Sequence, residues 1–142
     1  MTAVVEIARS WIGTPYVHQA SVRGAGCDCL GLIRGVWRTL HGAEPQAVPP
    51  YTPDWSEPQG EEVLWAAAAA HLRPAVRPTP EPGQVVLFRM REAAVAKHLG
   101  IVSAMGADLA FIHAYARHGV VESPQSEPWL RRIVARFDFQ EG

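Results

Sequence analysis

The sequence Gly26-Cys27-Asp28-Cys29-Leu30-Gly31-Leu32-Ile33 joins a loop to a segment with helical periodicity. After Cys29, apolar side chains recur every three or four residues, at Leu32, Ile33, Val36, Trp37 and Leu40. This spacing predicts an amphipathic helix that stops at Gly42, because glycine is typical of helix C-termini. Asp28 is a residue type that caps helix N-termini, so Cys29 becomes the first helical residue and Cys27 stays in the loop.

The position of Cys29 favours chemistry over packing. Unpaired backbone N–H groups and the positive end of the helix dipole, both found at the first turn of a helix, stabilise a thiolate. The thiolate is the nucleophilic form of cysteine, so Cys29 is the candidate nucleophile. The alternative is that Cys29 is a small buried hydrophobic side chain and that Asp28 serves only as the cap.

The first half of the chain is expected to be helical with a proline-rich interruption. Apolar spacing predicts a first helix over residues 2–12, which Gly13-Thr14-Pro15 ends. Nine of the 12 prolines fall in residues 43–82, where regular structure is largely excluded. A short helix is expected over residues 60–72, because acidic residues favour its start and alanines favour its propagation.

The second half of the chain is rich in short β-type runs. These runs are QVVLFRM, HLGIVSAM, LAFIHAY, GVVES and RRIVARFDF, separated by turn-prone or charged segments. Helices followed by neighbouring strands predict an α+β fold, with N-terminal helices packed on a C-terminal antiparallel β-sheet. We expect a single domain over residues 1–142, with residues 43–82 as a proline-rich insertion.

Composition narrows the classes of function. The chain has 142 residues, 48% of them hydrophobic, and a formal net charge of -1, so no basic field predicts nucleic acid as a partner. No apolar run approaches the roughly 20 residues that span a bilayer, so no membrane span is expected. The N-terminal sequence MTAVVEIARSWIG lacks the basic start of a secretory signal, so we expect the chain to be cytoplasmic at synthesis.

The two cysteines are poor candidates for a disulfide or a metal site. Cys27 and Cys29 are separated by one residue, which leaves a loop too short for normal disulfide geometry. Their spacing also departs from the usual Cys-x-x-Cys zinc pattern, and no second ligand pair lies nearby in the sequence. We therefore expect no metal and no cofactor, and keep a zinc module built on the two cysteines as the minority alternative.

Two histidines lie in strand-like runs downstream of the thiol. His98 starts HLGIV and could act as a general base, although a histidine at a strand end can also simply face solvent. Phe111, His113 and Tyr115 share one strand face by alternation, and a polar ring among aromatic rings needs a hydrogen-bond partner. A hydrogen bond to His98 would give the His113 ring that partner and would orient His98. A cysteine at a helix start with two histidines on strands is typical of a cysteine hydrolase.

Tyr16 lies in the loop that leads to the cysteines. Its hydroxyl could complete an oxyanion hole with the backbone N–H of Cys29. The alternative, a tyrosine that packs its ring over a loop, is equally compatible with the spacing.

Five motifs in order resemble the NlpC-type family of cell-wall cysteine peptidases, which has a papain-like fold. The motifs are GTPY (13–16), DCLGL (28–32), GQVVLF (83–88), HLGIV (98–102) and FIHA (111–114). The resemblance implies Cys29 as nucleophile, His98 as base and His113 as the orienting residue. It also implies that Tyr16 serves the oxyanion site and that Asp28 contacts the free amine of a peptidoglycan stem peptide. The expected activity is endopeptidase cleavage in stem peptides, typically between γ-D-glutamyl and diamino-acid residues.

The sequence departs from the family pattern at Leu30, where serine commonly follows the nucleophile. This departure leaves the substrate preference open. The compact form and the DCLGL variant resemble the branch found in phage tails and gene transfer agents. That resemblance implies incorporation in a phage-like particle, with tail proteins as partners and action at the cell wall during DNA entry. The alternative function is a non-catalytic component of the same fold that acts in tail assembly or wall binding.

Overall fold

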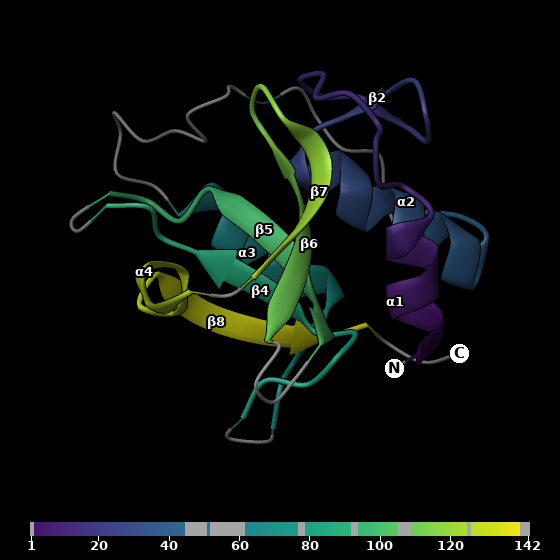
Figure 1. Ribbon diagram of the computed structural model, residues 1–142. Helices are drawn as coiled ribbons and strands as arrows, with labels where there is room; N and C mark the ends of the chain where they lie inside the picture. The colour runs from purple at the N-terminus through teal and green to yellow at the C-terminus, as the bar shows by residue number, and fades with distance from the viewer. Residues whose placement is uncertain are drawn as a thin grey trace.

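The computed structural model describes residues 2–44, 51, 62–76, 79–91, 94–104, 109–124 and 126–139. Its helices are α1 (Thr2–Arg9), α2 (Cys29–His41), α3 (Val63–His71) and α4 (Glu127–Leu130). Its strands are β1 (Ser21–Val22), β2 (Gly26–Cys27), β3 (Arg73–Pro74), β4 (Val85–Phe88), β5 (His98–Ala104), β6 (Ala110–Tyr115), β7 (Gly119–Pro124) and β8 (Ile133–Asp138). The first two helices lie beside a twisted sheet built from the second half of the chain (Figure 1).

The six strands of the sheet lie in the order β3-β8-β4-β5-β6-β7, and each strand pairs with its neighbours in antiparallel fashion. β1 and β2 form a separate two-stranded ribbon in the loop before α2. The predicted order of helices and then an antiparallel sheet is therefore correct. That residues 43–82 are an insertion in one domain over residues 1–142 stays a prediction, because much of this segment lies outside the described residues.

α2 begins and ends where its capping residues predict. The Asp28 carboxylate accepts a hydrogen bond from the backbone N–H of Gly31 at 2.7 Å, which satisfies one of the unpaired donors of the first turn. Gly42 adopts φ 87° and its N–H donates to the carbonyl of Arg38 at 2.8 Å. Cys29 is thus the first residue of the helix, as predicted.

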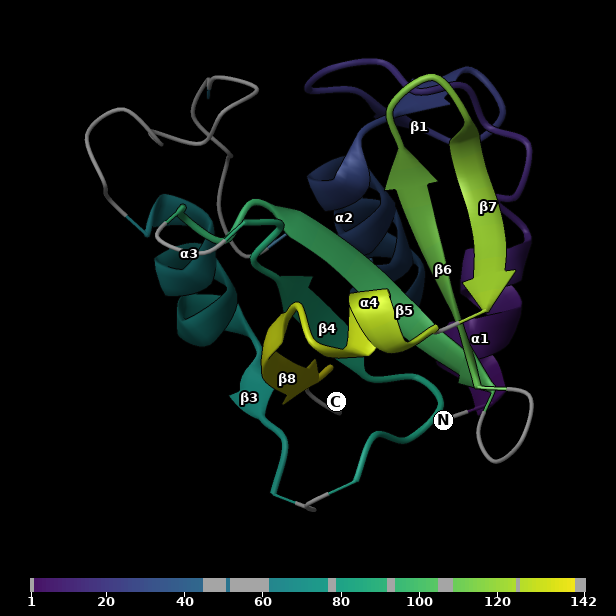
Figure 2. The same cartoon turned by 60° about the vertical axis from the view of Figure 1, so that its left-hand side comes forward.

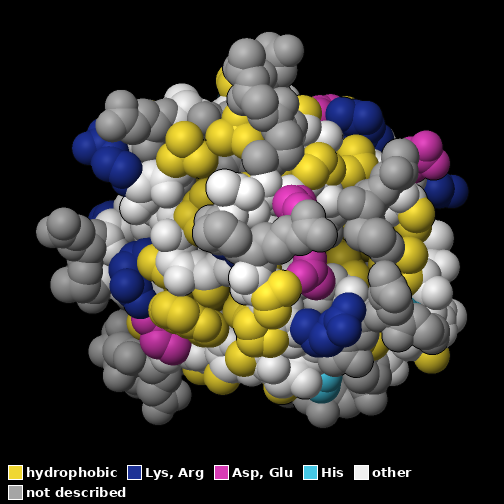
Figure 3. Space-filling model, turned by 90° about the horizontal axis from the view of Figure 1, so that it is seen from below, with side chains coloured by type: hydrophobic (Ala, Val, Ile, Leu, Met, Phe, Trp, Pro, Cys, Tyr) yellow, Lys and Arg dark blue, Asp and Glu magenta, His cyan; other side chains and the backbone are white. Residues whose placement is uncertain are grey.

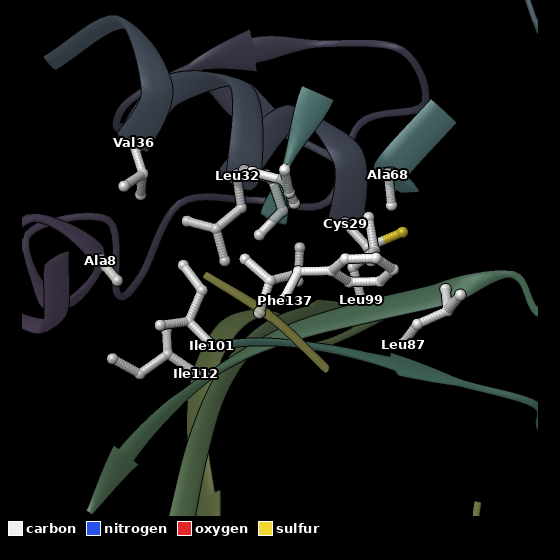
Figure 4. Close-up of a cluster of buried hydrophobic side chains, with 14 of the residues drawn as sticks. Ala8, Cys29, Leu32, Val36, Ala68, Leu87, Leu99, Ile101, Ile112 and Phe137 are labelled. Atoms are coloured by element: carbon white, nitrogen blue, oxygen red, sulfur yellow. The ribbon is translucent and has the colours of Figure 1, made fainter. Parts of the chain in front are cut away.

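Two apolar clusters cover the two faces of the sheet. The larger cluster packs α1, α2 and α3 against Leu99, Ile101 and Ile112 (Figure 4). The smaller cluster contains Val86, Phe88, Val102 and Phe111, with Trp129 of α4 packed against it. Side chains alternate across a strand, so β5 contributes to both clusters. Figure 2 shows the result, with α4 in front of β5 and α2 behind it.

The surface carries charges of both signs. On the face drawn in Figure 3, small groups of basic and acidic side chains, some of them side by side, are scattered among hydrophobic side chains. This agrees with the formal net charge of -1. Within the described residues, no helix has both the length and the apolar character needed to cross a membrane.

Candidate active site

The Cys29 thiol is buried at the N-terminus of α2. Its side chain is 5% exposed and belongs to the larger cluster, together with Leu99 and Ala68 (Figure 4). The S–H group donates to the carbonyl of Lys97 at 3.8 Å, so the thiol lies against the start of β5.

Burial raises the pKa of Cys29 to about 12, and the nearby Asp28 carboxylate adds to this effect. Hydrogen bonds from backbone groups of Leu99 and Leu30 oppose the rise without cancelling it. The expected thiolate at the helix start is therefore not present in this state. Removal of the thiol from water outweighs the stabilisation of a thiolate that the sequence led us to expect at the helix start.

The two predicted histidines lie in direct contact on neighbouring strands. The distance between His98 Nε2 and His113 Nδ1 is 2.7 Å, and His113 Nε2 lies 3.1 Å from the Ser123 hydroxyl on β7. Burial lowers the pKa of His98 to about 3 and that of His113 to about 4, and the neighbouring imidazole or His118 adds to each shift. Both rings are consequently neutral at pH 7. One ring donates and the other accepts, which fixes the orientation of His98.

Aromatic side chains surround the histidine pair. Phe88 lies 5.6 Å from the His98 ring, and Trp129 of α4 lies 5.8 Å from His98 and 5.3 Å from His113, between ring centroids. Both aromatic residues belong to the smaller cluster. The imidazoles therefore contact the α4 side of the sheet, whereas the thiol belongs to the α2 side.

Cys29 and His98 thus meet the same end of β5 from different sides. The thiol contacts the backbone of Lys97, which directly precedes His98. Within the residues that the structure describes, no hydrogen bond joins the thiol to the imidazole. The sequence-predicted pair His98–His113 is assembled, and the hydrogen bond between nucleophile and base is not formed in this state. Catalytic hydrogen bonds are often long or absent before substrate binds.

The Asp28 carboxylate is buried and already occupied by the protein's own donors. One oxygen accepts from Gly31, and the other accepts from the backbone N–H of Gln19 at 2.7 Å and from the Tyr51 hydroxyl. His18 Nδ1 lies 3.7 Å from the same oxygen. Asp28 therefore caps α2 and ties down the preceding loop. Its expected contact with a substrate amine stays a prediction, because any amine would have to replace one of these donors.

His18 and Tyr51, which no sequence pattern singles out, lie beside this carboxylate. The Tyr51 carbonyl accepts from His18 Nε2 at 2.9 Å and from Gln19 Nε2 at 2.6 Å. Tyr51 is 23 residues from Asp28 and falls in the proline-rich segment, where periodicity gives no signal. Only packing in three dimensions brings these side chains together.

Tyr16 lies close to the two cysteines. Its backbone forms an isolated parallel bridge with Cys27. Burial raises the pKa of the Tyr16 hydroxyl to about 12, and Cys29 and Asp28 are near enough to add to the shift. The hydroxyl therefore keeps its proton and can donate a hydrogen bond. Its role in an oxyanion hole stays a prediction.

The described part of the chain has two free, buried cysteines, Cys27 and Cys29. In the same residues, no group of three or more histidine, cysteine, aspartate or glutamate side chains could hold a metal ion.

Comparison with curated proteins gives one relative with a significant match. The γ-DL-glutamyl hydrolase of Bacillus subtilis (strain 168) is 31% identical over 138 residues, which are 95% of this chain. The chain spans 29% of the length of that protein. No protein-family model matches the chain.

Solved structures share the fold at lower identity. An NLP/P60 family lipoprotein-like protein from Staphylococcus aureus has a TM-score of 0.62 at 17% identity, over 99% of this chain and 41% of that one. An NlpC/P60 family protein from Bacillus cereus has a TM-score of 0.62 at 15% identity, over 94% of this chain and 38% of that one. The NlpC/p60 domain of the peptidoglycan hydrolase SagA has a TM-score of 0.60 at 22% identity, over 96% of this chain and 97% of that one. These likenesses confirm the predicted α+β fold.

Proposed function

We propose that this chain, which has the fold of the NlpC/P60 family, is a cysteine endopeptidase that hydrolyses amide bonds in peptidoglycan stem peptides. One observation carries the proposal. The Cys29 thiol, at the start of α2, lies against the start of β5, and His98 at that strand end is hydrogen-bonded to His113. The names of two similar proteins, a γ-DL-glutamyl hydrolase and a peptidoglycan hydrolase, support the substrate class.

In the proposed mechanism, His98 takes the proton of the Cys29 thiol, and the thiolate attacks the carbonyl carbon of the scissile amide. The oxyanion that forms is held by the Cys29 backbone N–H and the Tyr16 hydroxyl. His98 then gives its proton to the departing amine nitrogen, which leaves a thioester. A water molecule loses a proton to His98 and attacks the thioester carbon. The carbon–sulfur bond breaks to release a carboxylic acid, and His98 returns its proton to the Cys29 sulfur, which restores the thiol. His113 keeps the His98 ring oriented throughout.

In this proposal, the buried thiol belongs to a resting state of the enzyme. Cys29 and His98 are both neutral and are not hydrogen-bonded to each other among the described residues, so this is a resting state. In the proposal, substrate binding opens the packing over Cys29 and brings the imidazole to the thiol. The raised pKa of Cys29 then falls, because its main cause is burial.

The test is digestion of purified sacculi, followed by mass spectrometry of the released muropeptides. Cys29→Ala should abolish release, and Cys27→Ser is the matched control because Cys27 is also a buried, free thiol two residues away. Circular dichroism of both variants checks that they fold. Undiminished release by folded Cys29→Ala would show that the mechanism is wrong.

We further propose that the chain acts in the tail of a phage-like particle or gene transfer agent and loosens the wall during DNA entry. The DCLGL form of the nucleophile motif, with Leu30 after Cys29, supports this placement. The proposed partners are tail proteins, and the proposed route to the wall is the particle itself. Immunoblotting of purified particles tests the placement: the chain should copurify with particles, and its absence from them would contradict the proposal.

A second candidate function is a non-catalytic tail or wall-binding component. The observation that favours it is the buried, neutral thiol without a hydrogen bond to His98 in the described residues. On this alternative, Cys29→Ala particles assemble and deliver DNA as wild-type particles do. Loss of delivery by assembled Cys29→Ala particles would favour the peptidase.

A further inference from the structure

Four arginines line one hollow on the α4 side of the sheet. The hollow has a volume of about 500 Å³, and its lining includes Arg89, Arg91, Arg131 and Arg132, together with Met90 and Val134. Neither histidine of the candidate active site lines it, and nothing in the proposed mechanism uses it.

The pairing of β4 with β8 creates this cluster. The backbone N–H of Arg89 donates to the carbonyl of Arg132 at 2.8 Å, just beyond the ladder in which Phe88 faces Ile133. Arg131 and Arg132 form the turn between α4 and β8, and Arg91 follows β4. Cationic side chains from two distant parts of the sequence therefore surround one space.

Among the ion pairs of the described residues, one involves an arginine of the hollow. Glu62 forms an ion pair with Arg89 at 2.6 Å. Within the described residues, Arg131 and Arg132 have no ion pair, and Arg132 lies 5.8 Å from the centroid of the Trp129 ring. Like charges gathered in this way repel one another unless an anion joins them. Guanidinium groups bind carboxylates through two parallel hydrogen bonds, which suits this lining to carboxylate ligands.

Trp129 connects the arginines of the hollow to the histidine pair. Trp129 lies against the Arg132 guanidinium and against the rings of His98 and His113. On the neighbouring strand, Arg89 directly follows Phe88, which pairs with His98 across the β4–β5 ladder. A substrate held at His98 would have to extend past Trp129 to meet the arginines.

We propose that this arginine hollow binds the free α-carboxylates of γ-glutamyl units next to the scissile bond. A γ-linked glutamyl residue uses its side-chain carboxyl in the amide, so its α-carboxyl stays free and is ionised at neutral pH. An amidated unit lacks that charge. The hollow thus makes the proposed peptidase selective for γ-glutamyl substrates whose α-carboxyls are not amidated. This inference rests on the proposed function for its link to catalysis.

Binding tests the hollow separately from chemistry. Full-length Cys29→Ala is titrated with a γ-glutamyl oligomer, and with the same oligomer carrying α-carboxamides, by isothermal calorimetry. We expect the free acid to bind at least about tenfold more tightly, since each charge-assisted hydrogen bond carries that much. Adding Arg131→Gln and Arg132→Gln should remove this preference, whereas Arg23→Gln, an exposed arginine elsewhere, should preserve it.

Each outcome has one meaning. Equal affinity for the acid and the amide, or an equal loss with Arg23→Gln, overturns the hollow as a carboxylate site. Binding that depends on Arg131 and Arg132, in a chain whose Cys29 form hydrolyses nothing, supports the hollow while the proposed peptidase fails. Hydrolysis that requires Cys29 but proceeds equally on free and amidated α-carboxyls supports the peptidase and shows that the hollow is not a carboxylate site.

Discussion

Lowering the pH should destabilise the folded chain through His98 and His113. Both histidines have pKa values lowered by burial, to about 3 and about 4, so both stay neutral in the folded state where the unfolded chain protonates them. Below about pH 6.5 the unfolded state therefore binds more protons, and the free energy of unfolding falls as pH falls. The slope is about 1.4 kcal/mol per pH unit for each histidine, or about 2.7 kcal/mol for the pair. Domains are typically stable by about 5–15 kcal/mol, so the loss is readily measured.

The assay is urea denaturation at half-unit steps between pH 6.5 and 5, a window above the ordinary pKa range of the carboxylates. The comparison between variants uses the slope of the free energy of unfolding against pH, so differences in absolute stability between the variants do not affect it. The double variant His98→Gln, His113→Gln should lose most of the slope, and His118→Gln, an exposed histidine, should keep it. An unchanged slope in the double variant would refute the assignment of buried, neutral imidazoles.

Three further predictions concern the thiol, its cap and its helix. Iodoacetamide should label Cys29 slowly at pH 6–8, because burial raises the pKa of the thiol, and unfolding in urea should accelerate the labelling. Rapid labelling of the folded chain at pH 6 would contradict this prediction. Asp28→Ala should lower the free energy of unfolding by about 2–4 kcal/mol, because the helix cap and the hydrogen bond to Gln19 are lost. Asp28→Asn should lower it by less. Equal losses for the two variants in urea denaturation would contradict the role of the cap. Gly35→Ala should cost about 1–3 kcal/mol, because the added Cβ would lie 2.0 Å from the Trp11 ring, and an unchanged melting temperature would show that Trp11 moves aside freely.

The parts of the site that local rules govern could be predicted from the sequence. The Asp28 cap fixed which cysteine starts α2, because capping depends on residue type and one helical turn. Strand alternation placed His113 on the face of Phe111 and Tyr115, and that face carries the contact with His98.

The parts that depend on packing between distant segments could not be predicted. Cys29 is buried in a cluster that residues from α1, α3 and the sheet complete, and this burial reverses the expected effect on the thiol pKa. Tyr51 reaches Asp28 from the proline-rich stretch. The arginine hollow depends on the β4–β8 pairing, which joins Arg89 to Arg132 although 42 residues separate them in the sequence.

The most direct test of the central claim is detection of the thioester on Cys29. The full-length chain is mixed with a γ-glutamyl stem peptide, stopped in acid and measured by intact-protein mass spectrometry, and fragmentation of the peptide that contains Cys27 and Cys29 locates the adduct. The account predicts an acyl group on Cys29, absent from the Cys29→Ala chain. Turnover of the peptide with an adduct on Cys27, or by the Cys29→Ala chain, would contradict it.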